Sequence, residues 1–345
     1  MRLKGVCYDV GRVMMRRQWR PVFDLAVVRR ELEIIRNDLH CNAVRLQGLD
    51  PARLDAAAEI ALPLGLEVWY SPELWDRRPG PTLRYLQRAA RSAEALRQRW
   101  PDRVVLSVGS ELTLFMQGFL PGRNVLRRLE NPRLAELVRS GTHLAALRAF
   151  LARANEVARA EFHGKVTYAS ILMERVDWSL FDYVGVDLYR GAPLGSDRYV
   201  ELIRRYASLG KPLANMECGC CTFRGAEELG GRGWQILDYR QRPPRLTGPY
   251  IYDQGAQARE VADLLRVNDA AGVDAMFVFT FVEAPWEIKS RRERKMLSKI
   301  SFDPDITHYS LVKNTVDGRE GTAFPGVPWE PKESFRAVAE YYGSH

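Results

Sequence analysis

The stretch Val104-Val105-Leu106-Ser107-Val108-Gly109-Ser110-Glu111 is a run of apolar and small residues that ends on a carboxylate. Such a run is typical of a strand buried on both faces of a parallel sheet. A second stretch, Pro212-Leu213-Ala214-Asn215-Met216-Glu217, has the same form and also ends on a glutamate. We therefore predict two buried strands whose carboxyl ends carry Glu111 and Glu217.

Short apolar or aromatic runs alternate with amphipathic helical segments on both sides of these two stretches. The predicted strands are residues 4–10, 42–47, 66–71, 104–109, 165–170, 183–189, 212–217 and 275–281. The predicted helices are residues 24–39, 51–62, 81–100, 142–162, 196–208, 254–271 and 331–342, with only a short turn at 173–181. Eight such strands are what a closed barrel of parallel strands requires. We predict an α/β fold, a single (β/α)8 TIM barrel that forms one domain over residues 1–345.

The segments that follow the fourth, seventh and eighth predicted strands are long. They cover residues 112–141, 218–253 and 282–330. In (β/α)8 barrels the loops after the strands build the active-site face. The extra length therefore lies where a binding or catalytic site is expected.

The composition is that of an ordinary globular protein, with 46% hydrophobic and 27% charged residues. The sequence has no run of about 18 apolar residues, so we expect no membrane partner. The N-terminus passes into the first predicted strand without an apolar signal region, which predicts a cytoplasmic protein. The cysteines are five, an odd number, and we then expect them to be reduced thiols: Cys7, Cys41, Cys218, Cys220 and Cys221.

The formal net charge of +8 raises the question of nucleic-acid binding, which Lys and Arg drive by neutralising phosphates. The arginines are scattered along the predicted helices, where a solvated face accounts for them, so we do not expect nucleic acid as a partner. The basic run at residues 289–299 could hold a phosphate, although a solvated loop is the simpler interpretation. Cys218, Cys220 and Cys221 lack the second pair of a typical zinc site, because only Cys7 and Cys41 remain, so we predict no metal. The chemistry predicted below needs no cofactor.

The two glutamates indicate a reaction. Strand ends of a barrel meet at one mouth, so Glu111 and Glu217 are expected to face each other across it. Glycosidic bond cleavage with retention needs such a pair, one to protonate the leaving oxygen and one to attack the anomeric carbon. Carboxyl groups roughly 5 Å apart leave no room for the water of an inverting reaction. A lone glutamate at a strand end is more often a polar stop, and it is the pairing that favours catalysis.

With glutamates after strands four and seven, the sequence resembles the clan A glycoside hydrolases. The resemblance covers nearly the whole chain, with residues 182–189 similar to the clan's sixth strand and 329–335 to its closing helix. It implies that Glu111 is the acid/base, that Glu217 is the nucleophile, and that Arg45, near the end of strand two, supports the nucleophile. Two positions differ from the clan: Ser110 replaces the usual Asn, and strand eight lacks the usual Trp.

The sequence also resembles an actinobacterial family labelled abortive infection protein. The resemblance includes the motifs GSELTLF at residues 109–115 and ECGCCTFRG at residues 217–225. That label implies a role in phage defence and no particular chemistry.

Polar and aromatic residues at or just beyond the predicted strand ends are candidates for binding a sugar. Besides Arg45 and Ser110, these candidates are Tyr8, Asp9, Tyr70, Glu73, Asp187 and Tyr189. Trp286, in the long loop after strand eight, is a candidate for stacking on a sugar ring. For the strand-end residues, packing within the barrel or contact with solvent is at least as good an interpretation, and for Trp286 anchoring of the loop to the core is the more common use.

The first functional hypothesis is a retaining glycoside hydrolase or transglycosidase. The missing signal region favours a small glycoside over bulk polysaccharide as its substrate. The alternative is a barrel altered in catalysis that binds a sugar, a nucleotide or a phage component in phage defence. The sequence indicates neither the sugar and its acceptor nor the oligomeric state.

Overall fold

The computed structural model describes the chain except for residues 15–16, 193, 284–290, 292–294, 296–297 and 316–317. Eight parallel strands form one sheet in the order β7-β6-β5-β4-β1-β12-β9-β8. Their bounds are β1 Leu3–Gly11, β4 Ala43–Gly48, β5 Glu67–Pro72, β6 Val104–Ser110, β7 Lys165–Ala169, β8 Val184–Asp187, β9 Leu213–Cys218 and β12 Ala275–Val278. A parallel bridge between Ser170 and Val186 joins the two edge strands. The sheet therefore closes into the predicted (β/α)8 TIM barrel.

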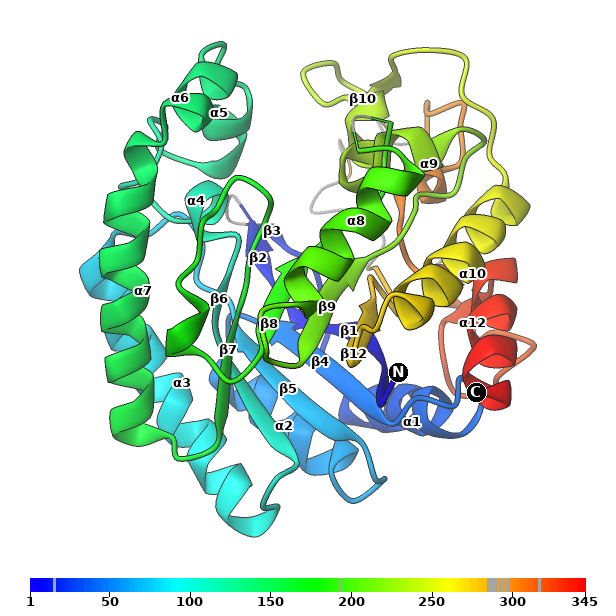
Figure 1. Cartoon of the computed structure of the whole chain (residues 1–345). Coiled ribbons are helices and arrows are strands. Elements are labelled where there is room, and N and C mark those ends of the chain that lie inside the picture. The colour runs from blue at the N-terminus through cyan, green and yellow to red at the C-terminus, as the bar shows by residue number, and fades with distance from the viewer. Residues whose placement is uncertain (15–16, 193, 284–290, 292–294, 296–297, 316–317) are drawn as a thin grey trace.

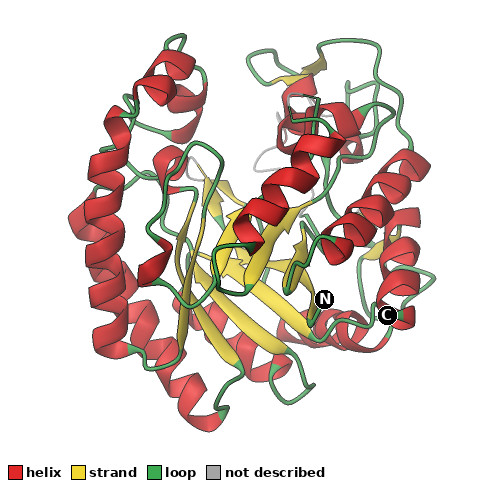
Figure 2. Ribbon diagram, in the orientation of Figure 1, coloured by secondary structure: helices red, strands yellow, loops and turns green. Residues whose placement is uncertain are grey.

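Helices surround the barrel, as Figures 1 and 2 show. The longer ones are α1 Leu25–Asn37, α2 Pro51–Ala61, α3 Pro79–Arg99, α7 Thr142–Glu161, α8 Ser196–Ala207, α10 Gln254–Ala270 and α12 Glu333–Ser344. The short 3-10 helix η1 Trp178–Leu180 follows β7, where only a turn is predicted. Every predicted strand and helix is confirmed, with ends that differ by at most three residues.

The start of α1 illustrates why these segments form helices. Asp24 is the N-cap residue, and its carboxylate accepts a hydrogen bond from the Ala26 backbone N–H (2.8 Å). Val28, Leu32 and Ile35 follow at three- and four-residue steps and are fully buried. These apolar residues at helical spacing favour the helix, and their burial packs it against the barrel.

The apolar core has two parts, one between strands and helices and one inside the barrel. The inner part is built around Trp69, whose ring centroid lies 4.8 Å from that of Tyr183 and 4.9 Å from that of Phe277. Gly5 makes room for the Phe277 ring, because a Cβ atom at this position would lie 2.5 Å from it. The interior also holds Arg45, which is fully buried and needs compensating charges.

The three long loops carry small elements, and those after β6 and β9 extend beyond the carboxyl ends of the strands (Figure 1). The loop after β6 contains α4 Leu112–Phe115, α5 Val125–Leu129 and α6 Leu134–Ser140. The loop after β9 contains α9 Ala226–Leu229, η2 Gly230–Ile236, β10 Leu237–Asp238 and β11 Arg245–Leu246. The segment after β12 contains η3 Pro304–Thr307, β13 Val312–Asn314 and β14 Trp329–Pro331, and β2 Val13–Met14 pairs with β3 Arg17–Gln18 after β1. Within the described part of the chain, no helix has the length and apolarity that a membrane span requires.

Candidate active site

Arg45 links three strands at the mouth of the barrel. Its Nη1 donates to Glu217 Oε1 (3.1 Å), to Asp187 Oδ1 (3.2 Å) and to the Met216 carbonyl (2.9 Å). Its Nε donates to Ser71 Oγ (3.1 Å). A fully buried guanidinium is stable only when such acceptors surround it. The Arg45 charge therefore fixes the carboxylates of β8 and β9 next to each other.

Glu217, near the end of β9, is held by three side chains. Its Oε1 accepts hydrogen bonds from Arg45 and from Gln47 Nε2 (2.6 Å). Its Oε2 accepts one from the Tyr189 hydroxyl (3.2 Å). The carboxylate is therefore fixed in orientation, and Oε2 has fewer donors than Oε1.

Glu111 follows β6 in a left-handed backbone conformation, with φ of 46°. Its backbone N–H donates to the Ala169 carbonyl (2.8 Å), which anchors this turn to β7. Burial raises the pKa of Glu111 well above its usual value, and the neighbouring carboxylates of Asp187 and Glu217 raise it further. Glu111 is therefore suited to hold a proton.

Asp187 completes a group of three carboxylates with Glu111 and Glu217. One oxygen from each lies within 4.8 Å of the others. Asp187 Oδ2 accepts a hydrogen bond from Ser110 Oγ (2.8 Å). Burial and the charge of Glu217 raise the pKa of Asp187. These oxygens are close enough to share a cation, and Arg45 already supplies one to Asp187 and Glu217.

The structure brings most of the predicted site residues together, namely Glu111, Glu217, Arg45, Ser110, Asp187, Tyr189 and Glu73. The Asp9 carboxylate binds the turn that follows β1. It accepts hydrogen bonds from the Gly11 and Arg12 backbone N–H groups and from Arg12 Nε (2.8 Å). Trp286 lies outside the described residues.

Two predicted site residues need correction. The Tyr8 hydroxyl donates to Glu31 on α1, and the Tyr70 hydroxyl donates to Asp55 on α2 (2.8 Å). Tyr8 and Tyr70 therefore face the helix layer and do not line the mouth, because side chains on a strand alternate between the two faces.

Gln47, which contacts the site, is absent from the sequence-based prediction, and so is a group of residues that follow β1, β5 and β6. Gln47 binds Glu217 directly, and its position two residues after Arg45 on one strand could have indicated it. The Trp75 ring stacks on Phe115 at 4.3 Å and meets Trp19 edge to face at 6.4 Å. The Arg12 guanidinium lies over the Trp19 ring at 4.4 Å. These residues come from loops, where no sequence periodicity indicates them.

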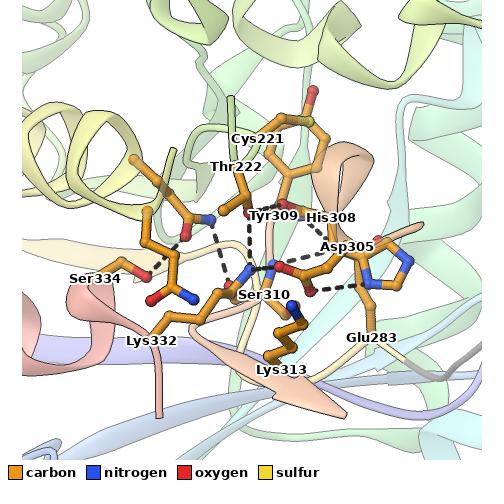
Figure 3. A network of polar contacts seen from close by, with 12 residues as sticks. Cys221, Thr222, Glu283, Asp305, His308, Tyr309, Ser310, Lys313, Lys332 and Ser334 are labelled. Carbon is orange, nitrogen blue, oxygen red and sulfur yellow. Dashed lines mark hydrogen bonds and ion pairs between the residues drawn. The ribbon is translucent and has the colours of Figure 1, made fainter. Parts of the chain in front are cut away.

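A buried polar network joins the loops after β9 and β12 (Figure 3). Lys332 is fully buried, and its Nζ donates to Asp305 Oδ2 (3.0 Å) and to Thr222 Oγ1 (2.8 Å). His308 Nδ1 lies 3.4 Å from Asp305 Oδ1. Glu283 accepts hydrogen bonds from the backbone N–H groups of Tyr309 (2.5 Å) and Ser310 (3.2 Å).

This network places an aromatic residue next to the site. The Tyr309 hydroxyl donates to the Gly230 carbonyl (2.7 Å) and accepts from the Gly233 N–H (2.9 Å). Its ring meets Tyr189 edge to face at 5.8 Å. Tyr189 in turn donates to Glu217, so the packing of the two long loops supports one of the glutamates.

Comparison with solved structures finds similar barrels among glycosidases. A GH113 β-1,4-mannanase matches with a TM-score of 0.60 at 14% identity, over 99% of each chain. A GH113 β-mannanase from Alicyclobacillus acidocaldarius matches with a TM-score of 0.56 at 16% identity, over 99% of this chain and 97% of its own. A β-glucuronidase from Bacteroides uniformis matches with a TM-score of 0.59 at 13% identity, over 100% of this chain and 38% of its own.

At these identities the likeness shows a fold that glycoside hydrolases share, and not a common substrate. No protein-family model matches the chain, and no curated protein matches it. The resemblance to the family labelled abortive infection protein therefore has no support from these comparisons.

Proposed function

We propose that the protein is a retaining glycoside hydrolase or transglycosidase that acts on a small glycoside by double displacement. Glu217 is the nucleophile and Glu111 is the acid/base. The observation that carries the proposal is the approach of an oxygen of Glu111 to within 4.8 Å of an oxygen of Glu217, at the ends of two barrel strands. Retaining enzymes hold their two carboxyl groups about 5 Å apart, whereas inverting enzymes separate them by roughly 6.5–9.5 Å.

The surroundings of the two glutamates support different roles. Arg45 and Gln47 donate to Glu217 and compensate a negative charge on it. The raised pKa of Glu111 favours a neutral carboxyl that has a proton to give. Two carboxyls with opposed environments are the usual arrangement of an acid and a nucleophile in one site.

The reaction follows from these roles. Oε2 of Glu217, whose donor is Tyr189, attacks the anomeric carbon while Glu111 protonates the departing glycosidic oxygen. The bond from the anomeric carbon to that oxygen breaks, and an ester between the sugar and Glu217 forms. Glu111, now a carboxylate, takes a proton from water or from an acceptor hydroxyl. That oxygen attacks the anomeric carbon and releases Glu217 as a carboxylate.

The proposal is tested with fluorogenic 4-methylumbelliferyl glycosides of both anomeric configurations. We expect Glu217→Gln to lose turnover while it still binds the substrate. Glu111→Gln should lower turnover by about 10²–10⁴-fold for poor leaving groups, and by less for activated ones. Glu67→Gln, at the amino end of β5 and thus at the other end of the barrel, is the matched control and should turn over normally.

Turnover that survives in Glu217→Gln would contradict the proposal. A wild-type protein that binds glycosides, without turning over any of them, would instead favour the binding role predicted as the alternative.

A further inference from the structure

Gln47 connects Glu217 to a further buried carboxylate, that of Glu73. Its Nε2 donates to Glu217 Oε1 (2.6 Å) and to Glu73 Oε1 (3.0 Å). Gln47 is fully buried, and Glu73 is 5% exposed. A primary amide has two hydrogens. One amide nitrogen therefore gives one hydrogen to each of the two carboxylates.

The orientation of this amide follows from its neighbours. Gln47 Oε1 is buried and has no hydrogen-bond partner among the described residues. In the reversed orientation the amide oxygen would face two carboxylate oxygens, which repel it. Both carboxylates therefore fix the Gln47 amide. A change at one carboxylate alters the hydrogen bond that Gln47 donates to the other.

Arg45 is also placed between the two carboxylates. Its Nη1 donates to Glu217 Oε1, and its Nη2 lies 4.0 Å from Glu73 Oε1. This Nη2 has no hydrogen-bond partner among the described residues, and neither has Glu73 Oε2. Glu73 and Glu217 therefore share both the donors of Gln47 and the charge of Arg45.

Charged and titratable groups surround Glu73 on several elements. They are Asp9 and Arg12 from β1 and the turn after it, Arg45 from β4, Tyr85 from α3, Asp187 from β8 and Glu217 from β9. The pKa of Glu73 is raised to about 7, mainly by burial and also by the charges of Glu217 and Asp9, against the opposing effect of Arg12 and Arg45. The charge of this group therefore changes close to neutral pH.

We propose that Glu73 is a positioning residue that tunes the nucleophilicity of Glu217 through Gln47 and Arg45; this role rests on the function proposed for Glu217. When Glu73 is neutral, it competes less for Gln47 and Arg45, and these two donors then stabilise the negative charge on Glu217 Oε1. When Glu73 is ionised, it competes for them and leaves Glu217 more reactive. The added negative charge also stabilises the positive charge that develops on the sugar in the transition state.

The kinetic test compares the pH dependence of kcat/KM in the wild type and in Glu73→Gln, with an activated aryl glycoside. Gln keeps an acceptor for Gln47 and cannot ionise. We expect the wild-type rate to rise through pH 7 relative to Glu73→Gln, so that their ratio grows about ten-fold between pH 5.5 and pH 8.5. Glu67→Gln is the control and should follow the wild-type profile. A ratio that stays constant over this range would overturn the proposal, because a merely structural role lowers the rate at every pH.

A second measurement does not depend on turnover. The protein is labelled with ¹³C at the glutamate carboxyl carbons, and the Glu73 signal is assigned by its loss in Glu73→Gln. We expect Glu73 to titrate near neutral pH in the wild type and at lower pH in Glu217→Gln, where a neighbouring negative charge is gone. An unchanged midpoint would overturn the coupling. A shifted midpoint in a protein that cleaves no glycoside would keep the coupling and reject the catalytic role of Glu217.

Discussion

Lys332→Met removes the only ammonium that contacts Asp305 in the described part of the network in Figure 3. Lys332 is fully buried and Asp305 is 4% exposed, so the substitution leaves a carboxylate without its cation in the interior. Removing one partner of a buried ion pair costs about 3–5 kcal/mol. The Tyr252 hydroxyl still donates to Asp305 (3.1 Å), and His308 lies 3.4 Å away. We therefore expect the lower end, about 3 kcal/mol.

The assay is urea denaturation followed by tryptophan fluorescence at pH 7. With an m-value of roughly 3 kcal/mol/M, a loss of about 3 kcal/mol lowers the midpoint by about 1 M. Lys313→Met is the matched control in the same loop, because its ion pair with Asp303 is half-exposed and should contribute less than about 1 kcal/mol. Adding Asp305→Asn to Lys332→Met removes the stranded charge and should restore about 1–2 kcal/mol.

The pH dependence of this stability difference gives a further test of the ion pair between Lys332 and Asp305. In the wild type the pKa of Asp305 is lowered, because Lys332 and His308 outweigh the effect of burial. The stability that this carboxylate contributes is present above its unfolded pKa and is lost as the pH falls through its folded pKa. The difference between wild type and Lys332→Met should therefore shrink in acid. An unchanged midpoint at pH 7, or a double variant no more stable than the single one, would refute the reasoning.

Other predictions concern the site. Arg45→Gln removes the group that fixes the carboxylates of Glu217 and Asp187 next to each other. It should lower kcat/KM at pH 7 by on the order of 100-fold, about 2.7 kcal/mol, in steady-state assays of protein shown to be folded; full activity would exclude the assigned role. Tyr189→Phe removes the hydrogen bond that orients Oε2 of Glu217, the attacking oxygen, and should lower kcat about ten-fold, with little change in circular dichroism. Asp187→Asn removes a carboxyl that raises the pKa of Glu111, so the alkaline decline of kcat/KM with a poor leaving group should begin at lower pH than in the wild type.

The barrel could be predicted from the sequence because its strands are buried on both faces. They then appear as continuous apolar runs, and stretches such as 104–109 and 212–217 stand out from the amphipathic helices between them. The two glutamates could be predicted for the same reason, since they end two of these runs. The eighth strand is shorter than predicted: β12 ends at Val278, whereas the predicted strand continues to residue 281.

The strand faces explain why Tyr8 and Tyr70 lie outside the site and Gln47 lies within it. Leu46 is the register partner of both Tyr8 and Tyr70, so all three face the helices. Gln47, one residue later, faces the barrel interior like Arg45. Once Arg45 is known to face inward, the alternation of side chains along β4 predicts that Gln47 faces inward too. A list of strand-end residues that ignores alternation includes residues from both faces.

The loop contributions have no comparable signal. Lys332 and Asp305 lie 27 positions apart, and Lys332 and Thr222 lie 110 apart. Trp75 and Phe115 follow different strands. Such contacts depend on how irregular segments fold onto one another, and neither helical nor strand periodicity constrains them.

The central claim is that Glu217 forms a covalent bond to the sugar. The most direct measurement incubates the pure protein with a panel of 2-fluoro glycosides that carry activated leaving groups, followed by intact mass and peptide mapping. We predict one added glycosyl group on the peptide that contains Glu217, and no label in Glu217→Gln. A label on Glu111, or release of sugar with inverted configuration from a substrate that the enzyme turns over, would contradict the claim.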